Sequence, residues 1–242
     1  MRNKLWMVIL VLALSLAACS QGSNQSSDSN STSKKGNNKV KYHRIVSLMP
    51  SNTEILYRLG LGNNIVGVST VDDYPKDVKK GKKQFDAMNL NKEKLLKAKP
   101  DLILAHESQK SSSGKVLNSL KKDGVKVVYV KDAQSINETY DTFKTIGKIT
   151  GREHQAQDLV DETKKNVDKV VNSVPKHHKK QSIFMEVSSK PDIYTAGKGT
   201  FFDDMLNQLD AKNSFSDING WKSVSKELSL IHISEPTRQE AI

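Results

Sequence analysis

The sequence predicts an α/β fold built on parallel strands. Three short apolar runs, each bounded by turn or helix-stopping residues, have the length of buried parallel strands: 45–48, 65–69 and 102–105. A helical pattern follows the first run and places Ile55, Leu56 and Leu59 on one face, which completes a βαβ series. A second helical pattern, over 152–174, contains neither glycine nor proline and extends roughly 34 Å at 1.5 Å per residue. A helix of that length indicates two lobes with a bridge between them.

Capping residues mark where several of these helices begin and end. Ser51 and Glu54 have the S-x-x-E spacing of a capping box, and Gly60 is suited to ending the helix that they begin. Ser135 and Glu138 repeat the spacing and predict another helix start. The other expected elements are a helix over 111–122, a strand over 125–130, a strand over 182–187 and a helix that starts within 194–200.

The strands also indicate where a ligand would bind. In sheets of this kind, ligands gather in the crevice at the carboxyl ends of the strands. Residues 49–53, 70–74 and 106–109 follow the three apolar runs. We therefore expect these three segments to line one crevice.

The amino terminus has the layout of an export signal. Arg2 and Lys4 precede an apolar run over 6–18, and the chain's one cysteine, Cys19, follows in L-A-A-C. This arrangement predicts a signal peptide over 1–18 and resembles the lipobox of bacterial lipoproteins, in which the cysteine becomes lipidated. The alternative is a buried or free thiol. Segment 19–40 is rich in Ser, Asn and Gly, so it is expected to be a flexible tether to the membrane surface.

The chain is basic, with a formal net charge of +11. Removing Arg2 and Lys4 with the signal leaves +9. Such a charge is compatible with nucleic acid, an anionic envelope or an acidic ligand. Export argues against nucleic acid, and the lysines are dispersed among acidic residues, which favours an ordinary solvated surface.

Sequence motifs of enzymes are absent from the chain. It has no G-x-S-x-G, no H-E-x-x-H and no cysteine nucleophile. Gly197–Thr200 lacks the pattern of a phosphate loop, and Gly60–Gly62 follows a helix rather than a strand. His177 and His178 have no third metal ligand near them in sequence, so a polar connector is the favoured interpretation. We therefore expect neither an enzyme nor a resident metal or cofactor.

Four segments resemble one protein family. They are R-I-V-S-L-M-P-S-N-T-E (44–54), V-G-V-S-T-V-D-D-Y-P (66–75), M-N-L-N-K-E-K-L-L-K-A-K-P-D-L-I-L-A (88–105) and G-W-K-S-V-S-K-E (220–227). In this order they resemble the solute-binding lipoproteins of ABC importers for cobalamin, ferric siderophores and haem, and most closely the cobalamin-binding branch. The resemblance implies two Rossmann-like lobes joined by one long helix, with the first lobe over 41–151, the helix over 152–174 and part of a second lobe over 175–227.

The resemblance also implies a function. A monomeric lipoprotein, anchored through Cys19 on the extracytoplasmic face of the cell membrane, would capture a cobalamin or ferric siderophore between its lobes. It would then deliver this metal chelate to an ABC permease and its ATPase. A haem receptor of the same family is one alternative, and a surface interaction or adhesion lipoprotein is another.

Site residues follow from the matched motifs and from the expected crevice. The expected ligand-binding residues are Met49, Pro50, Ser51, Asn52, Asp72, Tyr74, Phe85, His106, Tyr194 and Trp221. Glu93 and Glu227 match the family's glutamates that dock on permease arginines. Aromatic side chains suit a large flat chelate, because they bury much area at little entropic cost.

Two departures from the cobalamin pattern bear on the ligand. Val71 stands where the pattern has a tyrosine, and His106 stands where it has a tryptophan. His106 and Met49 are possible ligands of a haem or metal centre, although lining of the pocket is the favoured role.

The carboxyl terminus departs from the family as well. Residues 228–238 read L-S-L-I-H-I-S-E-P-T-R, which resembles a translated transposase adapter used in sequencing libraries. We expect that 228–242 is not native and that the second lobe is incomplete.

Overall fold

The computed structural model describes residues 39–175, 180–189 and 192–227. The expected signal peptide, Cys19, His177, His178 and the tail 228–242 lie outside the described residues. Residues 36–242 form a compact unit of their own.

A five-stranded parallel sheet organises the first lobe. Its strands, in spatial order, are β3 (Lys83–Phe85), β2 (Ile65–Ser69), β1 (Ile45–Ser47), β4 (Leu102–His106) and β5 (Lys126–Val130). Every neighbouring pair is parallel, as expected. The central strands β1 and β4 are buried along their whole length. The edge strand β3 was not predicted, because its K-Q-F has one apolar residue.

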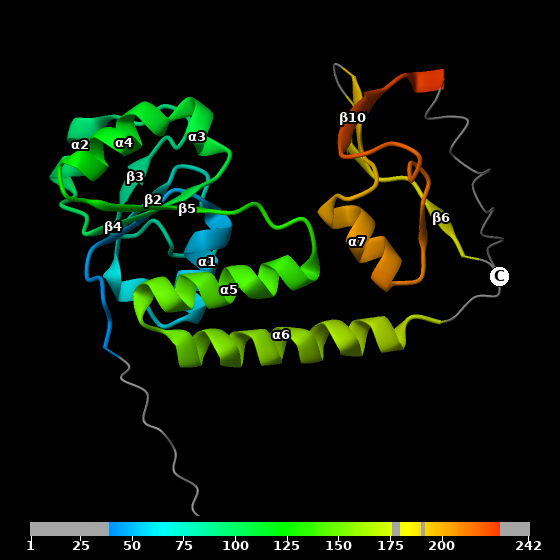
Figure 1. Cartoon of the computed structure of the whole chain (residues 1–242), viewed down its shortest axis with the longest axis horizontal. Coiled ribbons are helices and arrows are strands. Elements are labelled where there is room, and N and C mark those ends of the chain that lie inside the picture. The colour runs from blue at the N-terminus through cyan, green and yellow to red at the C-terminus, as the bar shows by residue number, and fades with distance from the viewer. Residues whose placement is uncertain (1–38, 176–179, 190–191, 228–242) are drawn as a thin grey trace, which may run out of the picture. The chain divides into compact units, whose positions relative to one another are not determined.

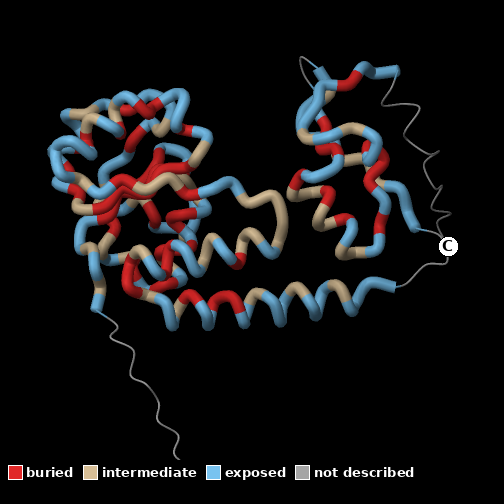
Figure 2. Tube along the Cα trace, in the orientation of Figure 1, coloured by how far each residue is buried: buried red, intermediate tan, exposed pale blue. Residues whose placement is uncertain are grey.

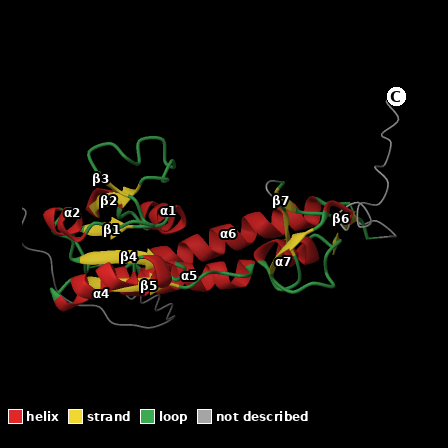
Figure 3. Cartoon of the chain, turned by 90° about the horizontal axis from the view of Figure 1, so that it is seen from above, coloured by secondary structure: helices red, strands yellow, loops and turns green. Residues whose placement is uncertain are grey.

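Helices cover both faces of this sheet (Figures 1 and 3). On one face lie α1 (Pro50–Arg58), α5 (Ile136–Thr150) and α6 (Glu153–Ser173); on the other lie α2 (Lys92–Lys97) and α4 (Gly114–Lys122). Successive side chains of a strand point to opposite faces. Ile45 accordingly packs in the core under α1 and α5, whereas Val46 packs in the core under α2 and α4.

The expected helix over 111–122 is two helices, α3 (Gln109–Ser112) and α4. The break falls at Ser113, whose hydroxyl donates to the carbonyl of Ala87 at 3.0 Å. That bond ties the break to the segment after β3.

Of the two expected capping boxes, the one at Ser135 forms in part: the serine caps the helix as predicted, and the glutamate accepts the N–H one residue before the N-cap. Ser135 Oγ accepts the N–H of Glu138 at 3.1 Å, and Glu138 Oε2 accepts the N–H of Gln134 at 2.9 Å. This backbone donor holds the pKa of Glu138 below its usual value. The box predicted at Ser51 is wrong: α1 begins at Pro50 with Met49 as N-cap and no side-chain cap. Proline suits the first helical position because it lacks the N–H that would be unpaired there.

The long helix predicted over 152–174 is α6. Its buried residues, Ala156, Leu159 and Val160, all lie in its first half (Figure 2). The other apolar positions of the predicted stripe, such as Val167 and Val170, are half-buried or exposed. Only the first half of α6 is therefore held by the core of the first lobe.

Short elements make up the described part beyond α6. They are β6 (Ser182–Ile183), β7 (Glu186–Ser188), β8 (Ile193–Ala196), α7 (Phe201–Gln208), β9 (Lys212–Asn213) and β10 (Trp221–Val224). β8 pairs antiparallel with β7 and β10, and β6 pairs parallel with β9. The strand expected over 182–187 is thus two strands of different sheets, and 194–196 is a strand rather than a helix start. Among the described residues, no helix is long and apolar enough to cross a bilayer.

Replacing the Ser135 cap tests the predicted start of α5. Ser135→Ala removes the acceptor of the Glu138 N–H, so we expect the free energy of unfolding to fall by about 1 kcal/mol. Urea denaturation followed by circular dichroism measures this change. Thr145→Ala, at an exposed position of the same helix, is the control and should change the value by less than about 0.5 kcal/mol. If Ser135→Ala lowers the free energy of unfolding no more than Thr145→Ala does, the cap does not stabilise the helix.

Candidate functional site

A cavity of about 450 Å³ opens at the carboxyl ends of β4 and β5. This volume lies within the range of small-molecule sites. Its lining includes Met49, Ser51 and Asn52 at the start of α1, His106 at the end of β4, Lys131, Asp132 and Ala133 after β5, and Phe143 and Leu159 from α5 and α6. Apolar side chains from β5 and the surrounding helices alternate with polar groups at the strand ends.

The cavity brings together four of the ten expected ligand-binding residues. Met49, Ser51, Asn52 and His106 all line it. Pro50 does not line it and occupies the first position of α1. The segment after β5 was not predicted, although β5 is the neighbour of β4. The rule that selected 106–109 applies equally to 131–133 and would have found it.

Protein groups engage both ring nitrogens of His106. The side chain is largely buried, at 8% exposure. Nδ1 lies 2.8 Å from Ser108 Oγ and accepts the Ser108 N–H at 3.3 Å. With Nδ1 an acceptor, Nε2 carries the proton of the neutral ring and lies 3.4 Å from Asp132 Oδ1. A metal would have to displace one of these partners, so the geometry favours His106 as a wall of the cavity.

Gln109 fixes the edge of the sheet beneath the cavity. Its Oε1 accepts the backbone N–H of His106 at 2.9 Å, and its Nε2 donates to the carbonyl of Leu48 at 2.8 Å. The buried amide therefore joins the ends of β1 and β4. It holds the start of α1 and the His106 side chain in a fixed relation.

Asn52 is a buried polar side chain without a partner. It is 1% exposed, and neither Oδ1 nor Nδ2 has a hydrogen bond to any residue that the structure describes. Burial of an unpaired amide costs free energy, so such a group calls for an explanation. Because Asn52 lines the cavity, a bound ligand or water is the natural source of the missing donor and acceptor.

Three expected site residues, two after β2 and one at the end of β3, lie outside the cavity. Phe85 is a core residue with 4% exposure, and its ring lies against Gly67, where a Cβ would be 2.4 Å from it. Asp72 is fully buried and accepts the Ser69 N–H and hydroxyl at 2.9 and 2.6 Å. Tyr74 is exposed in the loop that follows. Phe85 and Asp72 therefore stabilise the lobe and are not available at its surface.

Tyr194 and Trp221 share a face of the small antiparallel sheet. Trp221 is opposite Ala196, and Tyr194 is opposite Ser223, so the two aromatic side chains are diagonal neighbours. They are 39% and 37% exposed. Phe202, which the sequence analysis missed, packs its ring edge-on to Trp221 at 5.8 Å between centroids. The result is an aromatic surface that is separate from the lining of the cavity.

The two expected docking glutamates are exposed. Glu93 lies in the first turn of α2, which the Asn91 side chain caps at the Lys94 N–H. Glu227 is the last residue of the described chain, and hydrogen bonds from its own backbone N–H and from Ser225 lower its pKa. No cluster of three metal-ligating residues occurs within the described segments.

Comparisons with known proteins agree with this architecture. A family model described as periplasmic binding protein matches residues 45–240. YvrC of Bacillus subtilis, an uncharacterized ABC transporter substrate-binding lipoprotein, is 43% identical, and the match covers 93% of this chain and 76% of YvrC. The crystal structure of a possible iron-binding (periplasmic solute-binding) protein from Staphylococcus epidermidis is 81% identical, with a TM-score of 0.75 over 79% of this chain and 74% of that one. The vitamin B12-binding protein BtuF of Vibrio cholerae is 25% identical, with a TM-score of 0.64 over 79% and 73%.

Two substitutions of an amide by leucine distinguish a structural role from a ligand-binding role. Gln109→Leu leaves the Leu48 carbonyl and His106 N–H unpaired, so we expect the free energy of unfolding to fall by about 2–4 kcal/mol. Asn52→Leu removes an amide that has no protein partner, so it should cost less than about 1 kcal/mol or stabilise the chain. Urea denaturation of both variants measures the difference. Equal losses would mean that Asn52 is as well paired as Gln109.

Proposed function

Because the chain belongs to the periplasmic binding protein family, and so is an ABC transporter substrate-binding protein rather than an enzyme, we propose that its ligand is a metal chelate, either a cobalamin or a ferric siderophore. The cavity at the carboxyl edge of the sheet carries the proposal. It combines apolar walls with a few buried polar groups, the usual composition of a small-molecule site. A vitamin B12-binding protein and a possible iron-binding protein among the similar structures support this ligand class.

The aromatic surface of the second lobe supports a large flat ligand. Tyr194 and Trp221 present half-exposed rings on one sheet face, and Phe202 holds the Trp221 ring edge-on. Rings fixed in this way bury a wide ligand surface without losing much side-chain freedom. A chelate enclosed in an organic shell offers the matching surface.

Haem is the alternative within the same family. His106 and Met49 line the cavity and include the ligand types that haem iron accepts. His106 Nε2, however, faces Asp132 at 3.4 Å, and Nδ1 is engaged by Ser108. The resting geometry therefore favours contact with the outside of a chelate over coordination of its metal. A surface adhesion lipoprotein, the other alternative, would require no cavity of this kind.

Fluorescence titration of the processed chain tests the ligand class. The sequence contains Trp6 and Trp221, so loss of the signal peptide leaves Trp221 as the reporter. We expect cyanocobalamin or a ferric siderophore to quench Trp221 saturably, and His106→Ala to weaken binding about tenfold. His154→Ala, at an exposed position on α6, should leave the affinity unchanged.

The same titration separates the alternatives. A shifted haem absorption band that His106→Ala abolishes would favour the haem receptor. The absence of saturable binding by cobalamin, haem and siderophores alike would overturn the proposal and favour the adhesion protein.

Delivery to a permease forms the second part of the proposal. We propose that the chain acts as a monomer on the extracytoplasmic face of the cell membrane, anchored by a lipid on Cys19. Its exposed glutamates Glu93 and Glu227 would pair with permease arginines, and an ATPase would drive transport.

Neutralising the docking glutamates tests delivery apart from binding. In cells that carry only the variant gene, Glu93→Gln with Glu227→Gln should reduce uptake of labelled ligand at least tenfold, because both charged contacts are lost. The dissociation constant of the purified double variant should stay unchanged. Glu162→Gln, at an exposed position on α6, provides the control. Normal uptake by the double variant would refute docking through these residues.

A further inference from the structure

The amino ends of the sheet carry a row of positive charges. Because β1 to β5 are all parallel, the residues that precede them meet at one edge of the lobe. Cations gather there: Lys41, Arg44, Lys82, Lys83, Lys97, Lys99 and Lys126. We call these seven residues the basic edge. The basic edge runs along the amino ends of five strands, which together span about 19 Å because neighbouring strands lie about 4.8 Å apart.

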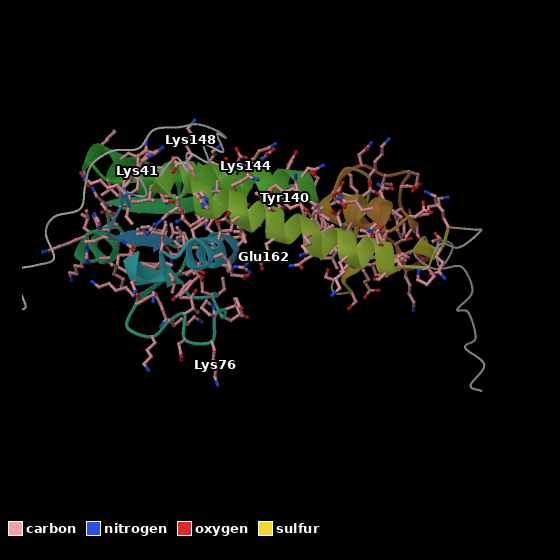
Figure 4. The ribbon with its side chains drawn as sticks, turned by 90° about the horizontal axis from the view of Figure 1, so that it is seen from below. Lys41, Lys76, Tyr140, Lys144, Lys148 and Glu162 are labelled. Carbon is pink, nitrogen blue, oxygen red and sulfur yellow. The ribbon has the colours of Figure 1, made fainter. Side chains whose placement is uncertain are left out.

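Contacts with the backbone hold part of the basic edge in place. The Arg44 guanidinium donates to the carbonyls of Ala98 and Lys99 at 2.6 and 2.8 Å, and Lys83 Nζ donates to Lys97 O at 2.8 Å. Lys41 Nζ donates to Lys148 O at 2.9 Å, and Figure 4 shows these two residues close together. Cations of this kind have a structural role, because carbonyls at the carboxyl end of a helix attract positive charge.

Lys82 Nζ lies 5.5 Å from the centroid of the Tyr57 ring. The side chains of the other three members of the basic edge have no partner among the described residues. The side chains of Lys97, Lys99 and Lys126 are exposed and make no hydrogen bond or ion pair with the described residues.

Acidic side chains at this edge have other partners. The Asp101 carboxylate accepts the N–H groups of His43 and Arg44 at 2.7 and 2.9 Å. Glu153 lies 3.7 Å from Lys41 Nζ, and Asp123 lies 2.8 Å from Lys92 Nζ. The exposed lysines are therefore available to an external partner.

The opposite edge of the same sheet has a nearly balanced charge. Acidic residues follow the strands there: Asp72, Asp73, Asp77, Asp86, Glu107 and Asp132. Lysines offset most of this charge: Lys76, Lys79, Lys80, Lys110 and Lys131. One of them, Lys79, donates to the Thr70 carbonyl at the end of β2 at 2.7 Å. The excess of cations therefore lies at the amino edge of the sheet.

We propose that the basic edge contacts an anionic phospholipid bilayer. The chain enters the lobe at this edge, where the Lys41 N–H bonds to the Thr150 carbonyl at 3.1 Å just before β1. Residues 20–38 separate Cys19 from Lys39. If they form the flexible tether expected from their composition, their root-mean-square span is about 25 Å. An anchor on Cys19 thus keeps the basic edge within reach of lipid headgroups while the chain is not docked on the permease. The tether argument rests on the lipidation proposed above, whereas the charge argument does not.

Vesicle binding of the unlipidated chain tests this surface. The protein is residues 19–242 with Cys19→Ser, which retains the compact unit 36–242. We expect it to co-sediment with vesicles that contain phosphatidylglycerol, and not with pure phosphatidylcholine, at 50 mM salt. Lys97→Gln, Lys99→Gln and Lys126→Gln together should weaken binding about 100-fold, at about fivefold for each lysine near the surface.

A matched triple variant controls for net charge. Lys76→Gln, Lys115→Gln and Lys165→Gln remove the same charge from exposed positions outside the basic edge, and should weaken binding less than threefold. Equal losses in both triples, binding to neutral vesicles, or equally tight binding of a soluble polyphosphate would each overturn the proposal. The chelate titration of each triple variant is expected to be unchanged, so failure of lipid binding is distinguishable from failure of the proposed ligand site.

Discussion

Burial of both faces of the parallel sheet is the constraint on which the first lobe depends. β1 and β4 lie at the centre and are fully buried, so each alternate side chain must enter one of two cores. Helices have to cover both faces, and the crossovers return every strand in the same direction. The carboxyl ends of all five strands then meet at one edge, where the backbone and polar side chains emerge from the core. The cavity lies there, lined by the ends of β4 and β5 and by residues of α1, α5 and α6.

The sequence predicted the buried part of this arrangement and missed what lies at its periphery. Continuous apolar runs identified four of the five strands, because full burial imposes a composition that can be recognised. The edge strand β3 does not have this apolar composition, since only Phe85 of its three residues enters the core. The site was affected as well. Phe85 was expected to contact the ligand because it falls at an aromatic position of the cobalamin-binding pattern, whereas its ring packs in the core against Gly67.

Local capping signals were informative only where the backbone geometry agreed with them. Ser135 and Glu138 start α5 as their spacing predicts, because the extended Ser135 can reach the Glu138 N–H. At α1 an equal spacing failed, since Pro50 already occupies the first helical position and places Ser51 inside the helix. The positions of His106 and Gln109 depend on a contact between residues 61 positions apart in sequence. The spacing of residues in the sequence does not reveal such a contact. The geometry of the cavity is therefore known only from the structure.

The polarity of the lobe follows from the same topology. Lysines and acidic residues alternate along the chain, and their pattern reads as an ordinary solvated surface. Parallel strands sort them, because residues before each strand reach one edge and residues after it reach the other. Helix ends contribute, since carbonyls at the end of α2 and α5 accept Lys83 and Lys41. The excess of cations at the amino edge is thus a consequence of the direction of the strands. The proposed contact with an anionic surface depends on this excess.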